Sequence, residues 1–186
     1  MAALLAAGMT PDDHLLDIGC GALRLGHLAV PFLGPGHYWG TDASLDLMLH
    51  GRQHELADPG RLPLSHLVQD AEFTFPGLPD TITLAIAFAV FTHLPAPLPA
   101  QALYNARTRF PRLRTLLFTV FHGDDGARAK RQPDGVVTHP DRPPYHVSEA
   151  ATRRMITEAG FIPARLPTRL PRGQVLWTAS APPQMP

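Results

Sequence analysis

The chain has 186 residues, of which 45% are apolar and 17% charged, so it can bury a core and is not a disordered chain. Sixteen basic residues balance sixteen acidic ones, so no overall charge draws it to nucleic acid or to an anionic membrane. The single cysteine excludes an internal disulfide, and no apolar run is long enough to cross a membrane. We expect one cytoplasmic domain over residues 1–186, with no nucleic-acid partner and no membrane contact, and the oligomeric state stays open.

Short apolar runs alternate with amphipathic stretches, which is typical of strand–helix units around a parallel sheet. Strands are predicted at 14–18, 36–42, 64–69, 81–89, 113–121, 161–166 and 174–180, and helices at 22–30, 44–56, 98–110 and 148–159. The last two strands are joined by a turn too short for a crossover helix, so they should pair antiparallel. In the helix at 44–56, the spacing directs four apolar residues inward: Leu45, Met48, Leu49 and Leu56.

The stretch at 122–146 is polar, contains glycine and proline, and has no periodicity. A segment of this length without regular structure is uncommon inside a compact domain unless it has a function. We therefore expect it to be a loop that covers a substrate.

Two glycines, Gly19 and Gly21, directly follow the first predicted strand and precede a helix. Without a Cβ atom the backbone can turn tightly and approach a ligand, toward which the helix N-terminus points free N–H groups. The alternative is a glycine-rich turn that binds nothing. A dinucleotide site would require the spacing G-x-G-x-x-G, but the next glycine is Gly26, two residues too late, which disfavours that site.

Asp42 closes the second predicted strand. In an open parallel sheet, ligands bind beyond the carboxyl ends of the strands, so the carboxylate of Asp42 can reach the ribose hydroxyls of a nucleoside held over the glycines. Asp42 can equally cap the following helix, and the two roles are compatible.

The chain resembles class I S-adenosylmethionine-dependent methyltransferases, and the resemblance covers nearly its whole length. The ordered motifs that carry it are Leu15–Gly21, Gly40–Asp42, Gln69–Ala71, Ala87–Leu94, Tyr145–Glu149 and Ala159–Phe161. This resemblance implies a Rossmann-like three-layer α/β sandwich with a seven-stranded, mostly parallel sheet whose last strand is antiparallel. It also implies S-adenosylmethionine as the cofactor.

The resemblance further implies which residues contact the cofactor. They are Asp17, Gly19, Cys20, Gly21, Asp42, Asp70, Ala71, Ala87 and Phe88. Asp17 and the backbone of Gly19–Gly21 would hold the methionine part, and Asp42 would bind the ribose hydroxyls. Asp70 would accept a hydrogen bond from the adenine amino group, with the N–H of Ala71 on a ring nitrogen.

The backbone around Ala87 and Phe88 would meet the ammonium end of the cofactor. The chain departs from the family pattern at Leu23, which replaces a third glycine, and at Thr83, where an acidic residue is usual. Because that acidic residue is often structural, its loss does not imply a loss of activity.

The acceptor side is less specified by the sequence, and no catalytic base can be assigned. His93 follows the fourth predicted strand, and Tyr145 and His146 end the long segment, so these three residues are the candidate catalytic or substrate contacts. His50 and His54 have the spacing of metal ligands on a helix, but no third ligand accompanies them, so we predict no metal.

These observations predict an enzyme that transfers a methyl group from S-adenosylmethionine to an oxygen or nitrogen of a small molecule. A non-catalytic relative that binds the cofactor without turnover is an alternative, because little chain precedes the first strand and Thr83 departs from the pattern. A nicotinamide-dependent oxidoreductase is a further alternative that the displaced third glycine disfavours.

Overall fold

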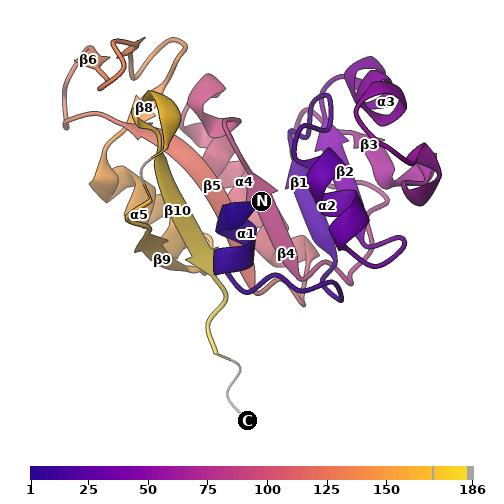
Figure 1. Cartoon of the computed structure of the whole chain (residues 1–186). Helices are drawn as coiled ribbons and strands as arrows, with labels where there is room; N and C mark the ends of the chain where they lie inside the picture. Colours follow the sequence, from indigo (N-terminus) through magenta and orange to yellow (C-terminus); the bar gives the residue numbers. More distant parts are fainter. Residues whose placement is uncertain (169, 184–186) are drawn as a thin grey trace. The chain divides into compact units, whose positions relative to one another are not determined.

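The computed structural model describes residues 1–168 and 170–183 (Figure 1). The helices are α1 (Ala2–Ala6), α2 (Gly26–Phe32), α3 (Leu45–His54), α4 (Pro97–Arg109) and α5 (Glu149–Glu158). The strands are β1 (Leu15–Ile18), β2 (Tyr38–Asp42), β3 (Leu67–Gln69), β4 (Leu84–Ala87), β5 (Thr115–His122), β6 (Lys130–Arg131), β7 (Val137–Thr138), β8 (His146–Val147), β9 (Ile162–Arg165) and β10 (Val175–Ser180). Short 3₁₀ turns lie at Pro59–Arg61, Leu64–His66, Phe91–His93 and Pro171–Gly173.

The chain divides into two compact units. The first comprises Met1–Ile86 and Arg109–Thr115, and the second Ala87–Thr108 and Leu116–Pro186. The prediction of a single domain over 1–186 stays a prediction, and its residues 169 and 184–186 lie outside the described residues.

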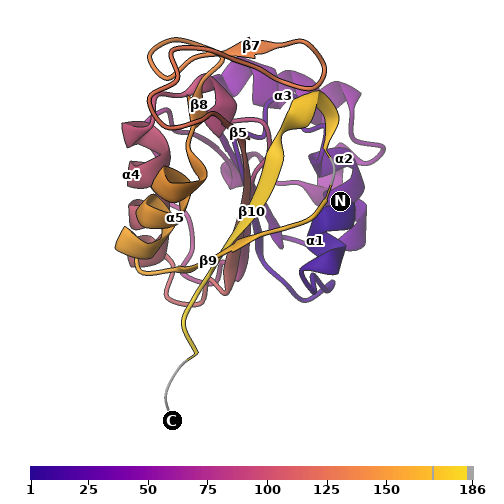
Figure 2. The ribbon, with the colours of Figure 1, turned by 90° about the vertical axis from the view of Figure 1, so that its left-hand side faces the viewer.

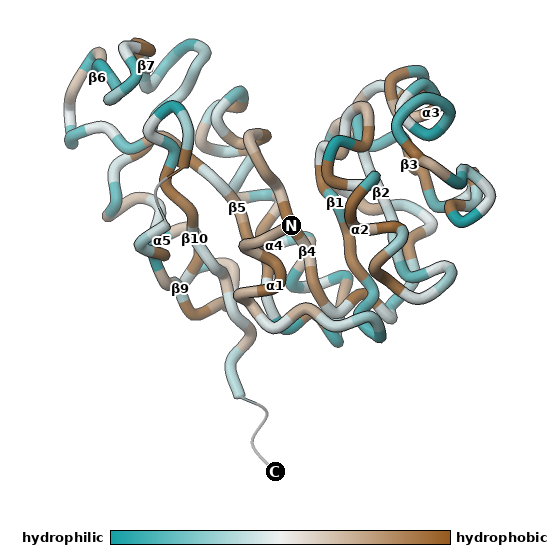
Figure 3. Tube along the Cα trace, viewed as in Figure 1, coloured by the Kyte–Doolittle hydropathy of each residue, from teal (hydrophilic) through white to brown (hydrophobic). Residues whose placement is uncertain are grey.

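The first unit contains four parallel strands in the order β3, β2, β1, β4. All residues of β1 and β4 are buried, as expected for parallel strands that are covered on both faces. The brown colour of β1 in Figure 3 reflects its apolar sequence, in which Asp17 is the one charged residue. The parallel pairing places the carboxyl ends of these strands along one edge.

The prediction of which residues of α3 point inward was wrong at two positions. Leu45 and Leu49 are both 38% exposed, whereas Met48 and Gly51 are the buried residues of the helix. The helix packs through its small residue Gly51, which turns Leu45 and Leu49 toward solvent. Ser44 caps the helix by accepting the N–H of Leu47, at 3.2 Å.

Thr83 has a structural role at the opposite ends of the strands from the glycine loop. Its hydroxyl donates to the carboxylate of Asp13 at 2.8 Å and accepts the N–H of His14 at 3.0 Å. The guanidinium of Arg114 pairs with the same carboxylate. These bonds connect the start of β4 to the start of β1. They involve Thr83, which stands at the position where the family pattern has an acidic residue.

In the second unit, β5, β10 and β9 are neighbours in this order, and β8 pairs in parallel with β5. β9 and β10 are antiparallel, which confirms the prediction for the last two strands. Pro163 lies in β9 at the edge of the sheet, where a missing N–H is tolerated. Helices α4 and α5 lie side by side (Figure 2), and the Arg107 guanidinium carbon lies 5.8 Å from the centroid of the Phe161 ring.

The segment at 122–146 is folded, which corrects the expectation of a structureless loop. It contains the antiparallel pair β6 and β7, and its last residue begins β8 (Figure 2). The fold is α/β, with an eight-stranded, mostly parallel sheet and one antiparallel pair, and so confirms the predicted fold class. The added strand relative to the expected seven is β8, which is too short to show a pattern in the sequence.

Among the described residues, no helix has both the length and the apolar character needed to span a bilayer.

Candidate functional site

The loops that follow β1, β2 and β3 are joined by backbone hydrogen bonds in the first unit. The N–H of Cys20 donates to the carbonyl of Thr41 at 3.0 Å, and the N–H of Asp70 donates to the carbonyl of Asp42 at 2.9 Å. The side-chain amide of Gln69 donates to the carbonyl of Ala43 at 2.8 Å. The structure therefore brings the three predicted cofactor motifs of this unit together at one edge.

The glycine loop has the backbone that the sequence predicts. Gly19 and Gly21 have φ values of 66° and 52°, in the left-handed region that a side chain disfavours. The N–H of Gly21 donates to Oδ2 of Asp42 at 2.9 Å, so the carboxylate fixes the turn.

The residues after the glycines form turns rather than the helix expected from Ala22, and α2 begins at Gly26. Leu23, at the place of the third glycine in the family pattern, also has a positive φ, of 59°, while its side chain is fully buried. A leucine therefore adopts the backbone conformation for which glycine is preferred, and fills the core at the same time.

Helix α3 supports the glycine loop through Gly51. A Cβ atom added to Gly51 would lie 2.4 Å from the carbonyl carbon and oxygen of Ala22. Gly51 is not among the site residues predicted from the sequence, although a glycine inside a predicted helix is a signal of close packing.

Cys20 packs beneath the loop, in surroundings that disfavour a nucleophilic thiolate. Its side chain is 7% exposed, and a Cβ atom at Gly40 would lie 2.8 Å from its sulfur. Burial raises the pKa of the Cys20 thiol far above its ordinary value, as do the charges of Asp17 and Asp42. Only its backbone is available to a ligand.

Asp17 is buried in β1 and accepts a short hydrogen bond. The hydroxyl of Tyr38 donates to its Oδ2 atom at 2.7 Å. Burial raises the pKa of Asp17 to about 7, although the Tyr38 bond opposes this shift. A carboxyl group with such a pKa is a feature of functional sites, and a cation nearby would ionise it.

Asp42 is half-buried, and each of its oxygens accepts one backbone N–H. Oδ1 accepts from Ser44 and Oδ2 from Gly21, both at 2.9 Å. A carboxylate has about four acceptor sites, so Asp42 keeps the capacity to accept two hydroxyl groups.

Asp70 organises its own loop. Oδ1 accepts the N–H groups of Glu72 and Thr74, at 3.0 and 3.2 Å, and Oδ2 accepts that of Phe75 at 2.8 Å. The side chain is 9% exposed, and the neighbouring Ala71 is exposed. The structure thus gives Asp70 a loop-forming role, and its predicted adenine contact stays a prediction.

Ala87 and Phe88 continue the chain at the carboxyl end of β4. Ala87 is fully buried, and Phe88 is 44% exposed. Ala89, the next residue, has a φ of 60°, and its N–H donates to the hydroxyl of Thr119 at 2.8 Å. Their predicted contact with the cofactor stays a prediction.

In the second unit, a cavity of about 220 Å³ is lined by one of the candidate acceptor residues, His93. The complete lining is Thr92, His93, Phe121, Val136, Pro143, Pro144, Arg172 and Gln174. Val136 and the two prolines belong to the segment at 122–146, so this segment contributes a wall of the cavity.

The other two candidates have different surroundings. His146 is 5% exposed, its Nδ1 atom lies 2.9 Å from the hydroxyl of Thr138, and its ring fills the space at Gly123, where a Cβ would lie 2.2 Å from Cδ2. It therefore holds the segment together and does not line the cavity. Tyr145 is half-buried, and its N–H donates to the carbonyl of Thr92 at 2.8 Å.

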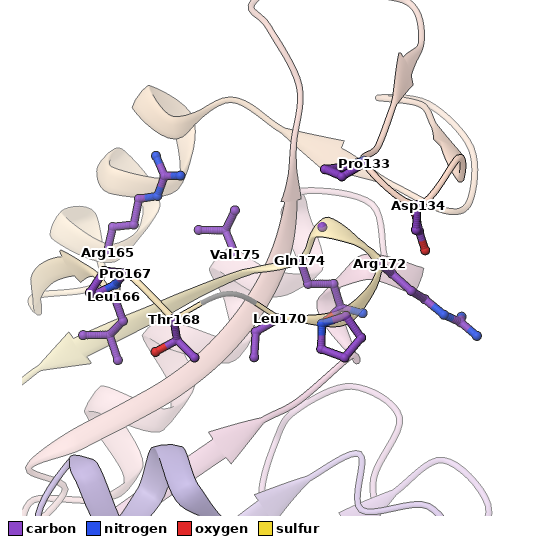
Figure 4. A pocket seen from close by; sticks show the side chains of 12 residues that line it. Pro133, Asp134, Arg165, Leu166, Pro167, Thr168, Leu170, Arg172, Gln174 and Val175 are labelled. Atoms are coloured by element: carbon purple, nitrogen blue, oxygen red, sulfur yellow. The ribbon is translucent and has the colours of Figure 1, made fainter.

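A larger cavity of about 740 Å³ adjoins the connection between β9 and β10 (Figure 4). It is lined by Pro133, Asp134, Arg165, Leu166, Pro167, Thr168, Leu170, Pro171, Arg172, Gly173, Gln174 and Val175. Arg172 and Gln174 line both cavities.

The described residues contain no group of three or more His, Cys, Asp and Glu side chains arranged to hold a metal. The rings of His50 and His54 lie 4.3 Å apart on an exposed face of α3.

No protein-family model and no curated protein sequence matches the chain. Solved structures do match it. Magnesium protoporphyrin IX methyltransferase from Synechocystis PCC 6803, with bound S-adenosylhomocysteine, is 19% identical and superposes with a TM-score of 0.70 over 97% of this chain and 80% of that one.

An S-adenosylmethionine-dependent methyltransferase from Methanosarcina mazei is 14% identical, with a TM-score of 0.63 over 96% of this chain and 98% of that chain. The glycopeptide N-methyltransferase MtfA, with bound S-adenosylhomocysteine, is 15% identical, with a TM-score of 0.65 over 97% and 86%. The chain therefore has the Rossmann-like fold of the class I S-adenosylmethionine-dependent methyltransferases.

Proposed function

We propose that the protein is an enzyme that transfers a methyl group from S-adenosylmethionine to an oxygen or nitrogen of a small molecule. The observation that carries the proposal is the hydrogen bond between the N–H of Gly21 and the carboxylate of Asp42, which joins a left-handed glycine turn to an acid at the end of the next strand. The binding of S-adenosylmethionine or its product by the structural neighbours supports the same cofactor here.

The residues of the first unit fit this cofactor. Gly19 and Gly21 present a backbone without side chains, where the methionine part would lie. Asp42 has unused acceptor capacity for the two ribose hydroxyls. Asp17, whose pKa lies at about 7, supplies a negative charge near a cationic ligand once it ionises.

The cofactor, when bound, would supply a methyl group attached to a positively charged sulfur. A nucleophilic atom of the acceptor would take this methyl group by in-line attack on its carbon, with the sulfur as the leaving group. The work left to the protein is to hold the two reactants in alignment and to keep water out. The tertiary contacts of the glycine loop serve alignment, because Gly51 and Asp42 fix the loop from two sides.

We assign the acceptor to the second unit, in the cavity lined by Thr92 and His93. His93 is exposed and lines this cavity, so its imidazole can form a hydrogen bond with an acceptor that binds there. A cavity walled by the folded segment at 122–146 supports a catalytic protein over a relative that only binds the cofactor.

Calorimetric binding of S-adenosylhomocysteine tests the cofactor. We expect micromolar binding by the wild type and its loss in Asp42→Ala, with weak binding in Asp42→Asn, which keeps one acceptor oxygen. Asp46→Ala, an exposed acid in the first turn of α3, is the matched control and should bind normally. A folded wild type that binds NADH instead would refute the proposal in favour of an oxidoreductase.

Incubation with a donor labelled in its methyl group tests the acceptor. Separate pools of small molecules and RNA are offered, and we expect label in the small-molecule pool. Label in RNA alone would overturn the small-molecule assignment and leave the cofactor assignment intact.

A further inference from the structure

The second unit holds two cavities whose linings share two polar residues, Arg172 and Gln174. Both residues come from the connection between β9 and β10. A molecule that occupies both cavities therefore has to pass these two side chains.

This connection packs closely against the ring of Pro133. A Cβ atom at Gly173 would lie 2.4 Å from Cδ of Pro133, in the segment at 122–146, and Gly173 has a φ of 71°. Glycine is thus required where the two segments meet. The residues on either side of it, Arg172 and Gln174, are held at this junction.

Gln174 offers a hydrogen-bond acceptor that no described residue satisfies. Its Oε1 atom is buried and has no hydrogen-bond partner in the described part of the chain. A buried polar atom without a partner costs free energy, so a ligand that brings an N–H or O–H donor to it gains that amount on binding. Figure 4 shows Gln174 and Leu170 between Arg165 on one side and Arg172 on the other.

Arg172 offers a positive charge. Its backbone is left-handed, with a φ of 61°, a conformation that a non-glycine residue rarely adopts and that is often found at binding sites. The other arginine of the lining, Arg165, already pairs with Glu149 at 2.8 Å. The acid of the lining, Asp134, accepts the N–H of Val136 within its own turn, and no ion pair between it and Arg172 occurs among residues 1–168 and 170–183.

Apolar residues make up half of each lining. Three prolines, two leucines and one valine are six of the twelve residues around the larger cavity, and Phe121, Val136 and two prolines are four of the eight around the smaller one. A volume of about 740 Å³ lies within the range of small-molecule pockets and exceeds what a single small ring would fill.

Resting on the proposed function, we infer that the methyl acceptor is an amphiphilic acid, with an apolar body for the larger cavity, a carboxylate that pairs with Arg172, and an N–H or O–H group near it that donates to Gln174. Arg172 and Gln174 are then the residues that determine acceptor specificity. Charge selects against neutral analogues, and the donor selects against analogues that leave Oε1 unpaired.

Three matched probes test this inference by calorimetry on the full chain saturated with S-adenosylhomocysteine. N-decanoylglycine has the carboxylate and the N–H, N-decanoylglycinamide lacks the charge, and N-decanoylsarcosine lacks the N–H. We expect the acid to bind at least about tenfold more tightly than either analogue, as one charge-assisted or buried hydrogen bond implies.

Each variant should remove one preference only. Arg172→Gln should bind N-decanoylglycine and its amide equally, while Gln174→Leu should bind N-decanoylglycine and N-decanoylsarcosine equally. Arg154→Gln, an exposed arginine of α5 outside both linings, should keep both preferences. Unchanged affinity for S-adenosylhomocysteine shows that each variant is folded.

Equal binding of the three probes by the wild type, no binding of the acid, or preferences that persist in the variants would overturn this inference. Each of these results leaves the proposed function standing if S-adenosylhomocysteine still binds. Failure of S-adenosylhomocysteine to bind the wild type would refute the proposed function itself.

Discussion

The hydroxyl group of Tyr38 donates a 2.7 Å hydrogen bond to the carboxylate of Asp17, and both side chains are almost completely buried. The two residues lie on neighbouring strands and are offset by two residues, since Asp17 pairs with Gly40 and Leu15 with Tyr38. Because residue 40, the register partner of Asp17, is glycine, the side chain of Cys20 can occupy the space that a side chain at position 40 would fill. An ionisable group is thus kept in the core directly below the glycine loop.

Asp17 makes both stability and cofactor affinity depend on pH. Its pKa of about 7 lies above that of the unfolded chain, so its contribution to folding is complete at low pH and is lost as the pH rises through 7. The ionised form should favour the cationic cofactor, so we expect affinity for S-adenosylmethionine to increase between pH 6 and 8. Calorimetry and thermal unfolding across this range, compared with Asp17→Asn, measure both effects. Equal pH profiles of the variant and the wild type would contradict this prediction.

Gly51→Ala should disturb the glycine loop although it lies on a helix. Alanine normally favours a helix by about 1 kcal/mol relative to glycine. Here the added carbon would lie 2.4 Å from the backbone of Ala22, and such overpacking costs about 1–3 kcal/mol. We expect a net loss in the free energy of unfolding and weaker binding of S-adenosylhomocysteine. Gln53→Ala, on the exposed part of α3, is the control and should change neither quantity.

Thr83→Val should destabilise the protein without affecting cofactor binding. The variant loses the hydrogen bonds to Asp13 and to the N–H of His14, which together are worth about 1–3 kcal/mol. Thr83 precedes β4, at the end opposite to the glycine loop. Urea denaturation should show the loss, and calorimetry should show unchanged affinity for S-adenosylhomocysteine. A variant with reduced affinity would instead indicate a role for this position in the site.

The fluorescence of Trp177 should respond to the protonation of His122. Its Nδ1–H donates to the carbonyl of Val147 at 3.0 Å, so Nε2 is the atom that accepts the indole N–H of Trp177, at 3.1 Å. Burial lowers the pKa of His122, although the bond to Val147 opposes the shift. The folded pKa is therefore below the unfolded one, and stability is full above about pH 6.5 and is lost as the pH falls through the folded pKa.

Protonation of Nε2 also breaks the bond to Trp177. In a Trp39→Phe background, we expect the fluorescence of Trp177 to titrate with acid. His122→Gln, which keeps a donor and an acceptor but does not titrate, should abolish this transition. A transition that persists in His122→Gln would assign it to another group.

The sequence by itself determined the features that depend on neighbouring residues. The alternation of apolar runs and helices specified a mostly parallel sheet, and the two glycines after the first strand specified a tight turn. The short connection between the last two strands specified their antiparallel pairing. These features follow from backbone geometry and periodicity, which act over a few residues.

Only the tertiary structure decided which residues face each other across long distances in the chain. Gly51 packs closely against the backbone of Ala22. Asp70 accepts hydrogen bonds from its own loop, whereas Asp42 accepts one from the glycine turn. His146 is enclosed by the folded segment at 122–146, whereas His93 lines a cavity. The sequence could not show this, because burial and hydrogen-bond partners arise from packing between segments that local patterns do not relate.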